Sequence, residues 1–295
     1  MSTKDLINTN NIVDKCLLVY LKISNIGDHK IDKEISSKVV ADYNADESAI
    51  KVRKNLFSSI PEHKAIASIA TKARADFNFH TLPWGDSSTR IVTKKIYVDT
   101  LSKDIQEYEL QFNNAVKEFI DNYDKIKIAV IGKMGKAWKE SDFPSKEKIA
   151  EEFKFSFNIS TVPNSDDFRL SANKEFEKEY INAYNKTVEN AIVNATNECT
   201  NRMKEKVYRL YDRLSKYSGN SDNRIRVEIV ETIKELAEFI KGFNVINSAK
   251  INEMYNDLIE LSKYDAEELR EVGYLRESVV GKAKEIMDKL SLPNA

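Results

Sequence analysis

The residues best suited to recognition chemistry lie together in one segment, 81–90. This segment reads Thr-Leu-Pro-Trp-Gly-Asp-Ser-Ser-Thr-Arg. Proline restricts the backbone, glycine permits a tight turn, and tryptophan offers a large flat surface with one N–H donor. Tryptophan and arginine are also the side chains that often anchor protein interfaces. The segment therefore predicts an interaction loop whose candidate residues are Leu82, Pro83, Trp84, Asp86 and Arg90.

A second interpretation of Trp84 needs no partner. The indole would fill the core where short helices meet a long helix, and an ion pair between Asp86 and Arg90 would hold the turn rigid. Truncation of Trp84 would then cost stability rather than binding. Both interpretations remain open from the sequence.

Five basic residues suggest contact with nucleic acid. They are spaced 4-3-4-3, so one face of a helix would carry Arg202, Lys206, Arg209, Arg213 and Lys216. Such a stripe could follow a phosphate backbone. The following helix carries an acidic stripe made of Glu228, Glu231, Glu235 and Glu238. A turn at Gly219 would let the two stripes form ion pairs between helices, and we favour that interpretation over nucleic-acid binding.

Familiar catalytic and metal-binding patterns do not occur in the sequence. Gly135-Lys136 follows an apolar run, but a phosphate-binding loop needs glycine where Val130 stands and a hydroxyl residue where Ala137 stands. The three histidines (His29, His63 and His80) belong to no H-E-x-x-H pattern or comparable ligand set. We therefore expect no metal, no cofactor and no catalytic residue, and the chain is predicted not to be an enzyme.

Composition limits the class of protein further. The 295 residues carry 46 Lys and Arg against 47 Asp and Glu, so no overall field favours nucleic acid or an anionic membrane. Only 8 glycines and 5 prolines occur, which argues against a turn-rich β architecture. Two distant cysteines exclude a disulfide framework, and no apolar run reaches the length of a membrane span. We expect a cytoplasmic protein.

The elements that position these residues are mostly helices. Apolar runs at 16–23 and 153–159 predict two strands, the second with clear alternation. A near-heptad seam predicts a long helix from 101 to about 130, with Leu101, Ile105, Tyr108, Phe112, Ala115, Phe119, Tyr123, Ile126 and Val130 on it. A second long helix is expected over 171–217, and shorter helices follow. The predicted fold is α+β and predominantly α: long antiparallel, coiled-coil-like helices with a two- or three-stranded sheet.

The expected organisation has an N-terminal α+β region, 1–163, and a C-terminal helical region, 164–295, and the two can also be read as one continuous domain. Within the first region, Thr81-Leu82-Pro83-Trp84-Gly85-Asp86 followed by Arg90 resembles a signature of uncharacterised tailed-bacteriophage and prophage proteins. The order of predicted elements up to 169 is similar as well. Proteins of this general kind resemble neighbours of MoxR-type AAA+ ATPases, which implies an adaptor role in the host cytoplasm.

Three functions are therefore carried forward. The first is a non-enzymatic, phage-type helical interaction or adaptor protein, with an AAA+ ATPase as the expected protein partner. The second is a nucleic-acid-binding accessory of phage DNA metabolism that uses the basic stripe. The third is a virion or assembly component, in which long helices act as spacers. Oligomer formation is compatible with each function.

Overall fold

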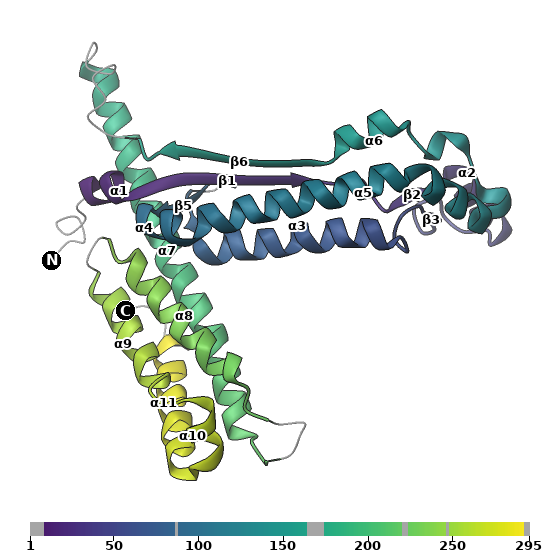
Figure 1. Cartoon of the computed structure of the whole chain (residues 1–295). Coiled ribbons are helices and arrows are strands. Elements are labelled where there is room, and N and C mark those ends of the chain that lie inside the picture. Colours follow the sequence, from purple (N-terminus) through teal and green to yellow (C-terminus); the bar gives the residue numbers. More distant parts are fainter. Residues whose placement is uncertain (1–8, 86–87, 164–173, 220–223, 246–247, 292–295) are drawn as a thin grey trace. The chain divides into compact units, whose positions relative to one another are not determined.

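The computed structural model describes residues 9–85, 88–163, 174–219, 224–245 and 248–291 (Figure 1). The chain forms two compact units, each assembled from separate stretches. The helical unit comprises Met1–Val19, His80–Val98 and Ile159–Ala295, and the aromatic unit comprises Tyr20–Phe79 and Asp99–Asn158. The sequence suggested a single boundary at 163, because it does not show that early strands and the 80–98 segment pack with late helices.

The strands form two sheets. Four strands lie in the order β4-β5-β1-β6: β4 (Leu82–Pro83), β5 (Arg90–Thr93), β1 (Cys16–Ser24) and β6 (Lys154–Thr161). β1 pairs antiparallel with β5 from Cys16 opposite Thr93 to Val19 opposite Arg90. A separate antiparallel ladder joins β2 (His29–Ile31) to β3 (Arg53–Asn55). Both predicted strands are confirmed, whereas the sequence missed the short strands, whose two to four residues give little periodicity.

The aromatic unit is built around one long helix, α5 (Ser102–Met134). Its predicted seam is confirmed, since the buried residues of the helix include Ile105, Phe112, Phe119, Tyr123, Ile126 and Val130. The seam meets aromatic rings: Phe119 packs on Phe153 with ring centroids 5.6 Å apart, and Phe112 packs on Phe155 at 5.7 Å. α3 (Pro61–His80) supplies Ile66, Ala70 and Ala73 to the same core.

Short helices and turns complete the aromatic unit or link it along the chain to the helical unit. They are α2 (Lys33–Asp42), α4 (Lys94–Ile96), a π-helical turn (Tyr97–Leu101), two 3-10 turns (Gly135–Ala137 and Glu140–Asp142) and α6 (Lys146–Glu152). The π-helical turn joins α4 directly to α5. Side chains of Asp32, Thr93 and Ser145 cap the N-termini of α2, α4 and α6.

The helical unit has its own core. It contains α1 (Thr9–Lys15), α7 (Lys174–Ser215), α8 (Val227–Phe243), α9 (Ala249–Leu261), α10 (Ala266–Glu271) and α11 (Gly273–Ser291). α7 packs mainly on α11 and α8, and α8 packs on α9. The face of α7 in this bundle carries Val188, Cys199, Met203, Val207, Leu210 and Leu214. The predominantly α, α+β fold is therefore confirmed, and each of the two long helices contributes to the core of its own unit.

Among the described residues, no helix is both long and apolar enough to cross a membrane.

A buried group of charges organises the aromatic unit. The Lys54 ammonium lies 2.8 Å from Asp32 and also contacts Asp142, and all three side chains are buried. Lys30 reaches Asp142 at 2.9 Å, and Lys139 reaches Glu34 at 2.9 Å. Hydrogen bonding to Lys54, assisted by the backbone N–H of Ile35, lowers the pKa of Asp32 to about 2. Burial alone would raise the pKa of Asp142, but Lys54 and Lys30 lower it.

This network predicts how the protein responds to acid. Because the carboxylate pKa values are lowered in the folded state, the stabilisation is complete above the ordinary pKa of aspartate, about 4, and is lost as pH falls toward 2. Replacement of Lys54 by methionine leaves two buried carboxylates without their shared cation, so Lys54→Met should lower the free energy of unfolding at pH 7 by about 3–5 kcal/mol.

Urea unfolding at pH 7 and between pH 4 and 2 measures both effects. Lys38→Met is the matched control, since Lys38 pairs with Glu34 on the surface of α2 and should change stability by less than about 0.5 kcal/mol. Equal stability of the two variants would contradict a structural role for the buried group.

Candidate functional site

The predicted interaction loop begins with a buried threonine held by two arginines. The carbonyl oxygen of Thr81 accepts hydrogen bonds from Arg90 at 3.0 Å and from Arg202 of α7 at 2.9 Å. Arg90 also donates to the Thr81 hydroxyl at 2.6 Å. Thr81 is 0% exposed, and burial followed by the nearby charge of Arg202 lowers the pKa of Arg90. These bonds fix the start of the loop on the bundle.

Trp84 belongs to the core of the helical unit. Its side chain is 8% exposed, and its backbone N–H donates to the carbonyl oxygen of Thr89 at 3.1 Å. Leu82 is buried beside it, Pro83 is half-buried, and Asp86 lies outside the described residues. The geometry therefore supports the core-filling interpretation of Trp84, and in this conformation neither Leu82 nor Trp84 is presented to a partner.

The indole lines a small apolar cavity of about 50 Å³. Both cysteines, Cys16 and Cys199, line the same cavity as free thiols. Burial raises the pKa of each thiol to about 12, so both remain protonated at neutral pH. A protonated, buried thiol is a weak nucleophile and a poor metal ligand, which makes this cavity a packing defect instead of a reactive site.

The predicted basic stripe divides into structural and exposed parts. Arg202 stacks over Phe239, with 4.9 Å from its guanidinium carbon to the ring centroid, and pairs with Glu198 at 3.0 Å. Arg202 is therefore committed to the core. Lys206 and Arg213 are half-buried on the same helix.

The outer part of the stripe is neutralised by its own helix. Arg209 lies 2.6 Å from Glu205 of α7, and Lys216, the first residue after α7, lies 2.5 Å from Asp212. The acidic stripe of α8 (Glu228, Glu231, Glu235 and Glu238) is exposed. At Arg202, Arg209 and Lys216, local pairs with acidic residues of α7 thus replace the expected pairs between helices. The reason is local: an acid four residues before a base is already within reach.

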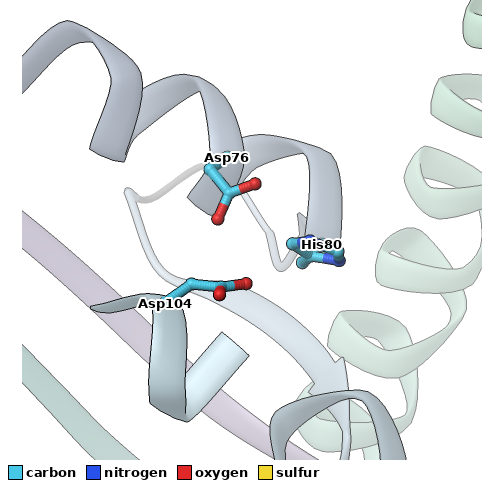
Figure 2. Close-up of side chains that lie close together, drawn as sticks. All are labelled: Asp76, His80 and Asp104. Carbon is cyan, nitrogen blue, oxygen red and sulfur yellow. The ribbon is translucent and has the colours of Figure 1, made fainter. Parts of the chain in front are cut away.

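A group that the sequence did not suggest lies at the end of α3. Asp76, His80 and Asp104 each place one ligand-type atom so that all three atoms lie within 4.8 Å of one another. Figure 2 shows the two carboxylates and the imidazole turned toward one another from α3 and from the beginning of α5. All three side chains are half-buried. We call them the Asp-His-Asp cluster.

A tyrosine adds to the polar character of this cluster. Burial, and then the negative charges of Asp76 and Asp104, raise the pKa of Tyr108, one turn after Asp104 on α5. Tyr108 therefore keeps its proton close to both carboxylates. The π-helical turn Tyr97–Leu101 ends three residues before Asp104. Such turns are rare and occur often beside functional sites.

Part of this cluster was visible in the sequence. Asp76 and His80 are four residues apart, which places both on one face of a helix. Asp104 lies 24 positions later in the chain, and nothing local brings it to them. The other histidines are elsewhere: His29 pairs with Asp28 at 2.5 Å, and His63 contacts the carbonyl oxygen of Ile26 at 3.2 Å. The sequence pattern thus did not reveal that His80 lies near two carboxylates.

Comparison with protein-family models, curated proteins and solved structures finds no match for this chain.

The burial of Trp84 predicts a large energetic effect of its truncation. Trp84→Ala should lower the free energy of unfolding by about 3–5 kcal/mol, because it removes a large buried side chain and enlarges an existing cavity. Urea unfolding followed by circular dichroism measures this loss. Arg209→Gln, which removes one exposed ion pair of α7, should cost less than about 0.5 kcal/mol. An unchanged stability of Trp84→Ala would show that the indole is not part of the core.

Proposed function

We propose that this chain is a non-enzymatic interaction protein that binds an extended segment of a protein partner along strand β6. The observation that carries the proposal is the place of β6 at the end of the strand order β4-β5-β1-β6. A terminal strand has one edge of backbone N–H and C=O groups that the sheet does not use. Extended peptides bind such edges by adding a further strand.

The side chains of β6 leave this edge accessible. Phe155 and Phe157 turn toward the aromatic core, where Phe157 packs edge-on against Phe77 with centroids 6.2 Å apart. Ser156, which lies between the two phenylalanines, and Asn158, which follows them, are exposed. The strand therefore alternates between aromatic residues packed in the core and small polar residues that would not block a strand added beside it.

The strand also lacks the usual protection against pairing. Edge strands are commonly defended by charged residues or by proline within them. In β6, Lys154 is the first residue, and the seven residues after it carry no charge and no proline. Ile159, 47% exposed, offers an apolar contact to an incoming strand. A long uncharged edge with an apolar residue suits a partner strand.

We propose no enzymatic role for the chain, because a buried lysine and both thiols are held in unreactive states. The Lys54 ammonium is occupied by two buried carboxylates. Burial by itself would lower the pKa of Lys54, but the two carboxylates outweigh it and raise the pKa. The thiols of Cys16 and Cys199 are protonated. The resemblance to tailed-phage proteins completes the proposal with an AAA+ ATPase complex as the partner, met in the host cytoplasm.

Charges placed on β6 should abolish this interaction. The double variant Asn158→Lys with Ile159→Lys introduces two charges on exposed positions of the strand and should lower capture of the partner at least tenfold relative to the unchanged chain. Ile128→Lys is the matched control, because Ile128 is an equally apolar and 71% exposed residue on α5. Affinity capture with mass spectrometry identifies the partner that the control retains.

Amide hydrogen exchange then locates the contact. Addition of that partner should slow exchange within Lys154–Thr161. Equal capture by the double variant and the control, or protection confined to other segments, would contradict strand addition. A protein that pairs with a second copy of itself would show the same protection without any partner, together with a doubled mass in sedimentation.

We propose nucleic-acid binding as a second function, at a site other than the basic stripe. A hollow of about 480 Å³ in the helical unit is lined by Lys15, Lys94 and Lys95 together with Asp14, Thr93 and Asn244. We call it the lysine hollow. Its three lysines are exposed, and within the described part of the chain no carboxylate lies within ion-pair distance of them. Unpaired ammonium groups around a hollow suit phosphate.

The lysine hollow and the stripe can be separated by charge reversal. Lys94→Glu with Lys95→Glu should lower retention on single-stranded DNA and reduce the dependence of log affinity on log salt by ~0.7 for each phosphate that the variant no longer neutralises. Arg209→Glu is the control, since Arg209 is paired with Glu205. A larger decrease of retention in Arg209→Glu would assign binding to the stripe instead.

A further inference from the structure

We propose that Asp76, His80 and Asp104 bind one divalent first-row transition-metal ion, for which Zn²⁺ is the reference. The ligands would be one carboxylate oxygen from each aspartate and one imidazole nitrogen of His80. Mixed imidazole and carboxylate sets suit ions of this class, whereas Mg²⁺ and Ca²⁺ prefer oxygen ligands alone. The inference is independent of the proposed function, because strand addition at β6 requires no ion.

The distances within the cluster fit a shared ion. The three ligand atoms lie within 4.8 Å of one another. Ligand atoms about 2.0–2.2 Å from a tetrahedral ion lie about 3.3–3.6 Å from one another. A pair of ligand atoms at the 4.8 Å limit would therefore have to close by about 1.2–1.5 Å when the ion binds.

The ligands stand on backbone that packing holds in place. Asp76 and His80 lie one turn apart on α3, the same spacing that places two metal ligands on one helix face in H-E-x-x-H proteins. Between and beside them, Ala73 and Phe77 of α3 are buried. Asp104 lies in the first turn of α5, between the buried residues Leu101 and Ile105. A site on such supported helices keeps its geometry without the ion.

Charge balance also favours a divalent ion. The charge of a divalent ion matches that of two carboxylate ligands, and imidazole completes the set as a neutral ligand. Burial, and then the charges of Asp76 and Asp104, raise the pKa of Tyr108, so its phenol group stays protonated near the two carboxylates.

The bound ion would join the end of α3 to the beginning of α5. Three protein ligands leave at least one position of a tetrahedral ion for water or another ligand. We expect the ion to bind the folded chain only, because folding is needed to bring Asp104 to Asp76 and His80. Metal should therefore raise the thermal midpoint, and the rise should increase with metal concentration.

The test uses the full chain after treatment with EDTA and dialysis. Calorimetric titration with Zn²⁺ should show one ion per chain, and titration with Co²⁺ should produce visible absorption bands typical of nitrogen and oxygen ligands. Asp104→Asn and His80→Gln should each weaken Zn²⁺ binding at least tenfold. Circular dichroism shows whether these variants are folded, and Asp76→Asn provides a third, independent removal of one ligand.

Two matched controls define the site. His29→Gln removes an exposed histidine that also lies beside an aspartate, Asp28, and Asp121→Asn removes an exposed carboxylate of α5. Both should bind one Zn²⁺ with unchanged affinity. Absence of stoichiometric binding to the unchanged chain would overturn the proposal, and so would equal affinity in Asp104→Asn and Asp121→Asn. The β6 double variant should bind Zn²⁺ normally, so failure here and failure of strand addition are distinguishable.

Discussion

In the helical unit, two guanidinium groups bind one peptide carbonyl and so fix the segment that leads into β4. Arg90 and Arg202 both donate to the carbonyl oxygen of Thr81, and they come from a strand and from a long helix. Buried guanidinium groups need such acceptors, since an unsatisfied buried donor costs more than a hydrogen bond contributes. With Thr81 held in place, β4 pairs with β5 and Trp84 enters the core.

The two units use charge in similar ways. In the helical unit, Arg202 is committed to Thr81, Glu198 and the ring of Phe239. In the aromatic unit, Lys54 is committed to Asp32 and Asp142. Charges that are fully paired inside the fold fix its geometry but have little capacity for chemistry. The proposed binding sites use groups outside these two buried networks: the backbone edge of β6, the lysine hollow and the Asp-His-Asp cluster.

Local pattern predicted the elements well and their partners poorly. The apolar seam of α5 and the alternation of β6 follow from side-chain periodicity, and both are observed. The sequence did not predict what covers the α5 seam, which packs on Phe153 and Phe155 and on α3. Spacing shows that a helix has an apolar face, but a second helix and an aromatic strand can each cover that face. For Trp84, residue type alone left both an interface role and a core role open.

The sequence by itself determined which residues share a face of one element. The spacing of Glu205 and Arg209, the spacing of Asp76 and His80, and the uncharged run of β6 are all of this kind, because a helix turn or a strand repeat spans only a few residues. Only the tertiary structure decided which elements meet. It brings Arg202 to Thr81 across 121 positions and Asp104 to His80, since such contacts depend on how whole helices and strands bury their apolar faces together.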